Sequence, residues 1–155
     1  MATHREAKNP SFAYVEPMPW PKDVPKVDEV GTTSAPLKSV SFFMGQFCKD
    51  YNEDFMLCKA ENRDPEHCLK EGRRVTRCAQ DLINRLNDKC ASEWEAHWKC
   101  LEMNNQEFMP CRKQERPLNK CVLDQLNLVK SIPGSPAGKP QIHEKTNPVV
   151  SRLQK

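Results

Sequence analysis

The sequence predicts an all-α protein made of two disulfide-stapled, antiparallel helical hairpins with extended N- and C-terminal arms. Two observations lead to this prediction. The eight cysteines fall into four C-x9-C motifs, in which nine residues separate one cysteine from the next. Ten of the 13 prolines lie outside residues 37–130, whereas all eight cysteines lie inside that range. The chain therefore divides into a compact helical centre and two arms in which proline disfavours helix.

Composition limits how far packing alone can stabilise this centre. Only 37% of the 155 residues are hydrophobic, and the mixed charges sum to +3. A small centre with few apolar residues buries little surface, so we expect crosslinks or a partner to add stability. The mild net charge gives no reason to expect a nucleic-acid partner. No segment approaches the roughly 18 to 20 apolar residues that cross a bilayer, and the N-terminus lacks the apolar core of a secretory signal peptide.

We expect five segments along the chain. They are an extended proline-rich N-terminal arm (1–34), a lead-in helix (35–47), the first hairpin (48–88), the second hairpin (89–130) and an extended C-terminal arm (131–155). The lead-in helix is expected to begin after Ser34, because a capping serine followed by Pro36 is typical of a helix start.

Local signals predict where the helices of the hairpins begin. Capping boxes at Asp50 and at Ser92 each predict a helix start. Asp64 before Pro65 predicts a helix that begins at the proline and continues to about residue 87, with apolar residues at helical spacing. The last helix is expected from near residue 106 to about residue 129, bent where Pro117 removes a backbone hydrogen bond.

The nine-residue spacing favours one disulfide pattern. Ten residues of α-helix rise about 15 Å and turn by about 1000°, so the two cysteines of one helix lie near opposite ends of a similar face. They cannot bond to each other, because a disulfide needs Cα atoms within roughly 7 Å. An antiparallel neighbour with the same spacing offers a partner at each end. Nested pairing joins Cys48 with Cys78, Cys58 with Cys68, Cys90 with Cys121, and Cys100 with Cys111.

Metal binding and redox catalysis fit these cysteines less well. Zinc sites usually bring ligands about two to four residues apart, and redox enzymes use a close pair such as C-x-x-C. Here no two cysteines are closer than ten positions. Nested pairing also leaves no free thiol. We therefore expect structural crosslinks, with no metal, no cofactor and no catalytic residue.

Disulfides indicate an oxidising compartment, although no secretory signal is present. The mitochondrial intermembrane space reconciles these two observations. Paired C-x9-C motifs on two helices resemble the coiled-coil-helix-coiled-coil-helix (CHCH) family, and four motifs make the chain similar to its twin-CHCH members. The resemblance implies import through a disulfide-relay oxidoreductase that docks on apolar residues near one cysteine. Residues that fit this docking role, or that simply belong to the core, are Phe55, Met56, Leu57, Phe108 and Met109.

Short segments around the cysteines narrow the resemblance. They are KVDEV (Lys26–Val30), TSAPLK (Thr33–Lys38), DFMLC (Asp54–Cys58), DPEHCLKEG (Asp64–Gly72), CRKQ (Cys111–Gln114) and KCVLDQL (Lys120–Leu126). In this order they are similar to the alpha subcomplex subunit 8 family, which are accessory subunits of NADH:ubiquinone oxidoreductase, respiratory complex I. This resemblance implies a non-catalytic structural and assembly subunit in contact with other membrane-arm subunits. It also implies a peripheral position on the intermembrane-space side of the mitochondrial inner membrane.

Two alternatives remain open from the sequence. One is a soluble intermembrane-space CHCH protein that acts in assembly or import without stable binding to complex I. The other is a secreted, disulfide-rich binding protein whose signal has been removed.

Several residues have a structural and a functional interpretation. Trp94 and Trp98 share a helix face, where they either pack in the core or anchor a partner. Trp20 in the N-terminal arm is a third apolar anchor for a partner. A basic stripe is either a solvated surface or a contact with anionic lipid or an acidic subunit. The stripe consists of Lys70, Arg73, Arg74 and Arg77.

Overall fold

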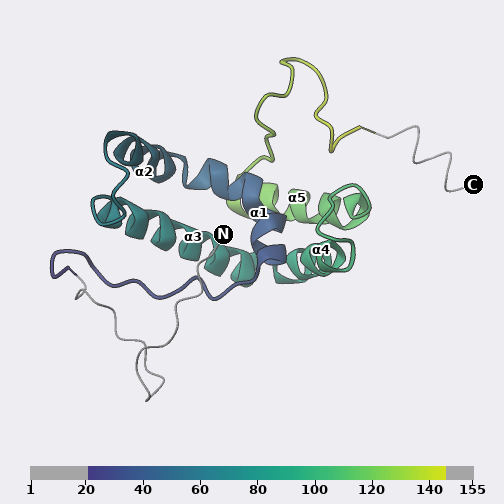
Figure 1. Ribbon diagram of the computed structural model, residues 1–155. Helices are drawn as coiled ribbons and strands as arrows, with labels where there is room; N and C mark the ends of the chain where they lie inside the picture. The colour runs from purple at the N-terminus through teal and green to yellow at the C-terminus, as the bar shows by residue number, and fades with distance from the viewer. Residues whose placement is uncertain (1–20, 146–155) are drawn as a thin grey trace, which may run out of the picture.

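Five α-helices make up most of residues 21–145, the part of the chain that the computed structural model describes. They are α1 (Ser34–Phe47), α2 (Lys49–Glu61), α3 (Leu69–Lys89), α4 (Ala91–Met103) and α5 (Arg112–Leu126). Within this range there is no β-strand. Helices α2 and α3 form one antiparallel hairpin, α4 and α5 form a second, and α1 packs mainly against α4 (Figure 1). The predicted all-α class with two helical hairpins is confirmed.

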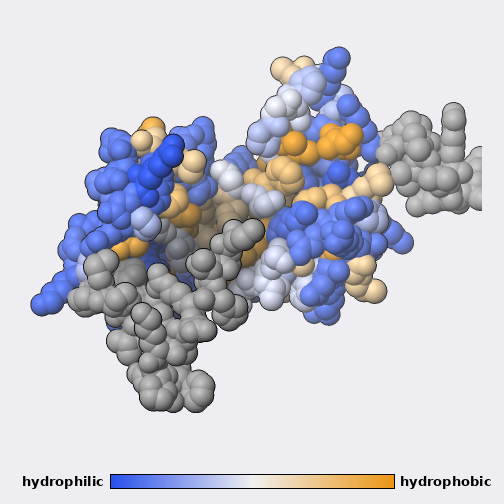
Figure 2. All heavy atoms as spheres, viewed as in Figure 1, coloured by the Kyte–Doolittle hydropathy of each residue, from blue (hydrophilic) through white to orange (hydrophobic). Residues whose placement is uncertain are grey.

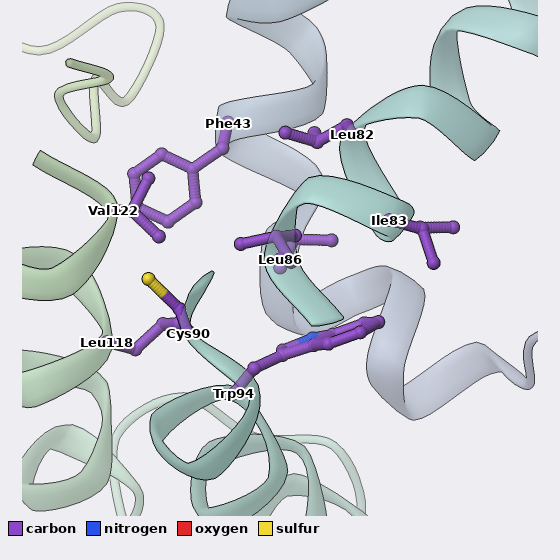
Figure 3. Close-up of a cluster of buried hydrophobic side chains, with 9 residues drawn as sticks. Phe43, Leu82, Ile83, Leu86, Cys90, Trp94, Leu118 and Val122 are labelled. Atoms are coloured by element: carbon purple, nitrogen blue, oxygen red, sulfur yellow. The ribbon is translucent and has the colours of Figure 1, made fainter. Parts of the chain in front are cut away.

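One hydrophobic core joins α1 and the second hairpin to the C-terminal half of α3. Its buried residues are Val40, Phe43, Leu82, Ile83, Leu86, Cys90, Trp94, Leu118 and Val122. Figure 3 shows Phe43, Leu86 and Val122 converging from three helices onto the region of Cys90. Buried positions on α3 recur at three- and four-residue spacing, which places them on one face of the helix. In contrast, α2 contributes no buried residue.

The surface reflects this uneven distribution of core residues. In Figure 2, hydrophilic side chains dominate both ends of the molecule, and apolar side chains gather toward its middle. Among the described residues, no helix is long and apolar enough to cross a membrane.

Each helix of the two hairpins begins directly after a cysteine. Cys48, Cys68, Cys90 and Cys111 are the N-cap residues of α2, α3, α4 and α5. None of the four makes a side-chain capping hydrogen bond. The disulfides therefore join helix starts to a neighbouring helix.

The predicted capping boxes are wrong as helix starts. Helix α2 begins at Lys49, before Asp50, and α4 begins at Ala91, before Ser92. Ser92 Oγ instead donates a hydrogen bond to the side chain of the adjacent Glu93 at 2.8 Å. Each of these helices begins directly after an N-cap cysteine, where the chain arrives from the preceding helix. The nearby polar side chains are therefore not needed as caps.

Two other helix starts lie later than the sequence predicts. Helix α3 begins at Leu69 rather than Pro65. Asp64 Oδ1 accepts a hydrogen bond from the Glu66 amide at 3.2 Å, so Asp64 stabilises the turn between the helices instead of the helix itself. Helix α5 begins at Arg112 rather than near Gln106, because Gln106 has φ = 58°, outside the helical region. Once started, α5 continues through Pro117 to Leu126.

The described part of the N-terminal arm lies against α3, whereas the chain after α5 returns to the helices at Lys130 and then loops outward (Figure 1). Residues 21–33 run beside α3 (Figure 1), where Gln80 Nε2 donates to the Asp28 carbonyl oxygen at 2.7 Å and Lys70 pairs with Asp23 at 2.8 Å. After α5, Asn127 adopts the left-handed conformation, with φ = 55°, and turns the chain back. The returning segment places Lys130 in the interior.

Candidate functional site

All eight cysteines are paired in disulfides. The pairs are Cys48–Cys78, Cys58–Cys68, Cys90–Cys121 and Cys100–Cys111, with Cα–Cα distances of 5.9, 6.0, 6.0 and 5.8 Å. These are the pairs that antiparallel nesting predicts. In each hairpin, one disulfide lies near the turn and the other lies at the open end.

The first hairpin depends on its two disulfides more than on packing. Helix α2 has no buried residue, so α2 and α3 do not share a hydrophobic core of their own. Phe55 is half-buried and faces Gly72 of α3. A Cβ atom at Gly72 would lie 3.4 Å from Phe55 Cε2, an ordinary contact distance, so the close approach of the helices does not require glycine. The covalent bonds at the two ends hold α2 in place.

The second hairpin contains a buried ion cluster. Glu115 on α5 is 1% exposed and forms ion pairs with Arg112, one turn earlier, and with Lys130, beyond the end of the helix. Lys130 is itself 5% exposed. A buried charge is costly unless it is paired and hydrogen-bonded, and here each carboxylate oxygen of Glu115 accepts from one cation.

Aromatic rings complete the surroundings of Lys130. Its Nζ atom lies 4.4 Å from the ring centroid of Phe42 and 4.5 Å from that of Phe108. The two rings meet edge to face at 5.8 Å. An ammonium group over aromatic faces is attracted by their quadrupoles, so the rings partly replace the lost hydration of Lys130.

A buried histidine lies beside this cluster. His97 on α4 is 0% exposed, and its Nδ1 lies 2.7 Å from Ser39 Oγ on α1. Its ring is 5.8 Å from that of Phe108. Its Nε2 has no hydrogen-bond partner among the described residues. The Ser39–His97 contact therefore links α1 to α4 inside the protein.

Burial and charge shift the pKa values of these groups. Burial lowers the pKa of His97 to about 4, so the imidazole is neutral at pH 7. Burial alone raises the pKa of Glu115, but the hydrogen bonds and charges of Lys130 and Arg112 outweigh it and hold the pKa below its ordinary value. Burial lowers the pKa of Lys130, against the opposing effect of Glu115.

This cluster was not predicted from the sequence, although the residue pattern of α5 indicates half of it. Cys111, Glu115, Leu118 and Val122 recur at four- and three-residue spacing and are all buried. A carboxylate on an apolar helix face signals a buried charge that needs a cation. Its partner Lys130 lies 15 residues away, after the turn at Asn127, so no helical periodicity points to it.

The residues predicted to dock an import oxidoreductase differ in their exposure. Met56 and Leu57 are 65% and 66% exposed on α2, and Met109 is 54% exposed before α5. Phe55 is half-buried between α2 and α3, and Phe108 is half-buried beside Lys130 of the buried ion cluster. Met56 and Leu57 are available to a partner, whereas Met109 and the two phenylalanines already have contacts within the chain.

The two described tryptophans among the predicted partner anchors also differ in their burial. Trp94 is a core residue, 5% exposed, and its Nε1 donates to the Pro36 carbonyl oxygen at 3.4 Å. The anchor interpretation is therefore wrong for Trp94. Its apolar ring fills the space between α1, α3 and α4 (Figure 3). Trp98 is half-buried against the core, and Trp20 lies outside the described residues.

One group of potential metal ligands occurs in the described part of the chain. Donor atoms of Cys58, His67 and Cys68 lie within 4.8 Å of one another. Both sulfur atoms belong to the Cys58–Cys68 disulfide, and the thiolate is the form that ligates metals. The arrangement is therefore a crosslink with a neighbouring histidine.

Two antiparallel helical hairpins, each closed by two nested disulfides from C-x9-C motifs, define the chain as a twin-CHCH protein. No protein-family model matches the sequence. Similarity to individual proteins is high, however. The chain is 50% identical over 127 residues to the NADH-ubiquinone oxidoreductase 20.8 kDa subunit of Neurospora crassa, which covers 81% of this chain and 69% of that protein.

Two plant proteins match the same family. The NADH dehydrogenase [ubiquinone] 1 alpha subcomplex subunits 8-A and 8-B of Arabidopsis thaliana are each 36% identical, over 88 and 97 residues. These matches cover 57% and 61% of this chain, and 82% and 92% of the plant proteins. The chain belongs to the alpha subcomplex subunit 8 family of accessory subunits of NADH:ubiquinone oxidoreductase, respiratory complex I.

Proposed function

We propose that the chain is a non-catalytic structural and assembly subunit that binds membrane-arm subunits of complex I on the intermembrane-space face. It is a peripheral protein of the mitochondrial inner membrane. Membership of the subunit 8 family supports the association with complex I. A structural observation on α2 supports the proposed side of the membrane.

Helix α2 supports the intermembrane-space location. It buries no residue and is attached to α3 by the disulfides at its two ends. Disulfides persist in oxidising compartments, whereas thiol reductants keep cysteines reduced in the cytosol. A fold that needs oxidised cysteines to place a whole helix is suited to the intermembrane space.

The buried cluster is suited to a structural rather than a catalytic role. Glu115 and His97 are 1% and 0% exposed, so neither side chain can touch a substrate. A general acid or base must come within hydrogen-bond reach of the reacting group. Instead, the His97 contact joins α1 to α4, and the Glu115–Lys130 ion pair joins α5 to the segment that follows it.

Blue-native separation of mitochondrial complexes tests the association. The tagged chain is expected in the complex I band, detected there by mass spectrometry together with membrane-arm subunits. Recovery only at low mass would overturn the proposal and favour a soluble assembly or import factor. Non-reducing peptide mapping of the same band is expected to show Cys48–Cys78 and Cys58–Cys68 linked peptides.

Protease protection tests the side of the membrane separately. In intact mitochondria the chain is expected to resist added protease, and rupture of the outer membrane alone should expose it. Resistance that persists until the inner membrane is lysed would place the chain on the matrix side and contradict the proposal. An intermembrane-space marker and a matrix marker serve as controls.

We further propose that Met56 and Leu57 contact the disulfide-relay oxidoreductase during import. Both are exposed, and both lie within two residues of Cys58. The double substitution Met56→Glu and Leu57→Glu is expected to slow oxidation of the newly imported chain, because it removes the apolar contact surface. Met103→Glu is the matched control, since Met103 is 86% exposed and lies on α4. Equal slowing in the control would contradict the docking role.

A further inference from the structure

Among the described residues, two arginines of the basic stripe on α3 remain without a carboxylate partner. Lys70 is paired with Asp23, and Arg73 has a contact within the protein. Within residues 21–145, neither Arg74 nor Arg77 forms an ion pair. Both are exposed, and because they are three residues apart they share one face of the helix. The structure thus reduces the predicted stripe of four cations to one available pair.

This pair lines a hollow of about 330 Å³ between the C-terminal end of α1 and the two helices of the first hairpin. The residues around it are Phe47, Tyr51, Arg74, Arg77, Cys78 and Asp81. Tyr51 is 45% exposed, so part of this residue is accessible from outside. We call this feature the Arg74–Arg77 hollow. It combines two guanidinium groups with two aromatic rings on one exposed side of the hairpin.

The single carboxylate in the lining is already neutralised. Arg85 Nε donates to both carboxylate oxygens of Asp81 at 3.1 Å, and Arg85 Nη2 lies 3.0 Å from Oδ2. The Arg85 guanidinium also lies 5.2 Å from the ring centroid of Phe47. The charge that faces the hollow is therefore positive, because Arg74 and Arg77 have no such counter-charge within residues 21–145.

We propose that the Arg74–Arg77 hollow binds the phosphate headgroup of an anionic phospholipid. Guanidinium groups donate parallel hydrogen bonds to phosphate oxygens, and two of them from one helix face can hold a single tetrahedral anion. The Tyr51 side chain suits the boundary between headgroups and water, because its ring is apolar and its hydroxyl is polar. The Phe47 ring adds apolar surface beside it. The inference rests on the proposed position of the chain at the inner membrane.

An acidic protein segment fits the same hollow less well. A headgroup phosphate is compact and places its charge at one point. An acidic polypeptide is extended, so it would continue along α2, which carries Asp50 and Asp54. Repulsion by these carboxylates disfavours a long anionic partner more than a small anionic group seated between Arg74 and Arg77.

Vesicle sedimentation with the full-length oxidised chain tests the proposal. The probes are vesicles of phosphatidylcholine alone and of phosphatidylcholine with about one-fifth phosphatidylglycerol. The wild-type chain is expected to bind the anionic vesicles, to release them at high salt, and to bind neutral vesicles weakly. Substitution of both arginines, Arg74→Gln with Arg77→Gln, should weaken partitioning on the order of 30-fold.

A matched double variant separates the hollow from net charge. Arg116→Gln with Lys120→Gln removes the same charge from exposed positions of α5 and should change partitioning by less than about threefold. Equal weakening in both double variants would overturn the proposal, because net charge would then explain binding. Failure of the wild type to bind anionic vesicles would overturn it as well. So would arginine-dependent binding to polyglutamate without vesicle binding, which would assign the hollow to an acidic protein.

Circular dichroism and non-reducing mass spectrometry verify that each variant keeps its helices and four disulfides. Assembly is measured independently by blue-native separation of mitochondria that express the Arg74→Gln, Arg77→Gln chain. If the wild-type chain enters the complex I band but does not bind vesicles, the lipid proposal fails and the proposed function stands. If the wild-type chain binds vesicles and is absent from that band, the proposed function fails instead.

Discussion

The Lys130 ammonium, beyond the end of α5, forms a buried ion pair with the Glu115 carboxylate within that helix. The pair spans 15 residues and encloses the turn at Asn127. It therefore fastens the start of the C-terminal segment to the second hairpin. Because both groups are at most 5% exposed, neither can recover its hydration if the other is removed.

Removing one charge of this pair should be strongly destabilising. Glu115→Gln leaves Lys130 buried without a counter-charge, so we expect the free energy of unfolding to fall by about 3–5 kcal/mol. Urea unfolding with disulfides intact measures this change. Asp81→Asn is the control, since the Asp81–Arg85 pair is half-exposed and should contribute less than about 1 kcal/mol. Similar losses in the two variants would contradict the structural importance of the buried cluster.

Replacing both charges tests whether the cost comes from an unpaired ion. Glu115→Leu combined with Lys130→Met should be less destabilising than Glu115→Gln alone, because no charge then remains buried without its partner. Arg112 can turn toward solvent, since its side chain is 27% exposed. A double variant that is less stable than the single variant would argue against this account.

Stability should fall as the pH drops from about 6.5 toward 4, in part because of His97. The folded-state pKa is about 4, below the ordinary value of 6.5, so the unfolded chain takes up a proton first as the pH falls. The contribution is fully present above pH 6.5 and amounts to roughly 3 kcal/mol across the window. The groups that face His97 are Glu115, Lys130 and Arg112.

His97→Gln isolates this contribution from other titrating groups. The variant should show a flatter dependence of unfolding free energy on pH between 6.5 and 5, where most carboxylates remain ionised. Urea unfolding at several pH values measures the slope in both proteins. Parallel slopes would show that His97 titrates alike in the folded and unfolded chains.

Removing the disulfide at the open end of a hairpin should have different structural consequences in the two hairpins. Cys48–Cys78 and Cys90–Cys121 enclose loops of similar length, with sequence separations of 30 and 31, so each should contribute roughly 3–4 kcal/mol. Cys48→Ser with Cys78→Ser should also free much of α2, which has no core contacts. Hydrogen exchange is expected to rise sharply across residues 49–61.

The matched variant is Cys90→Ser with Cys121→Ser. Helices α4 and α5 keep the buried contacts of Trp94, Leu118 and Val122, so their amides should remain protected at low denaturant. If both variants lose protection only in α4 and α5, the assignment of α2 as the disulfide-dependent helix is wrong.

Gly72→Ala should stabilise the protein by up to about 1 kcal/mol, because glycine is a poor residue inside a helix. The new methyl group would lie 3.4 Å from Phe55 Cε2, at ordinary contact distance. Thermal unfolding of the oxidised chain measures the change. Gly134→Ala is the opposing control, since φ = 80° at Gly134 strains any larger residue. A loss of stability in Gly72→Ala would indicate that the two helices cannot accept the methyl group.

Much of the fold was predictable because cysteine spacing is a geometric constraint. Nested pairing of helices with C-x9-C motifs leads to two hairpins, and the structure contains them. The helix starts were less predictable. Asp50, Asp64 and Ser92 have the chemistry of caps, yet the cysteines at the turns fix where the backbone becomes helical. Local propensity was overridden by covalent geometry.

The buried polar cluster was beyond sequence reasoning for a different reason. Its contacts join residues far apart in the chain, such as Ser39 with His97, which are separated by 58 positions. No periodic pattern relates them. Trp94 and Trp98 illustrate the same difficulty on one helix face, since only the packing of α1 and α3 decides that Trp94 is enclosed and Trp98 partly open.

A helix that is secured mainly by covalent bonds has unusual freedom in its amino-acid choices. Because no side chain of α2 is needed for a core, its outward positions can change during evolution with little effect on folding, provided Cys48 and Cys58 stay. What restrains those positions is then whatever the helix touches outside the chain. Saturation mutagenesis of α2 would identify this external contact, since the positions that do not tolerate substitution would be those that make it.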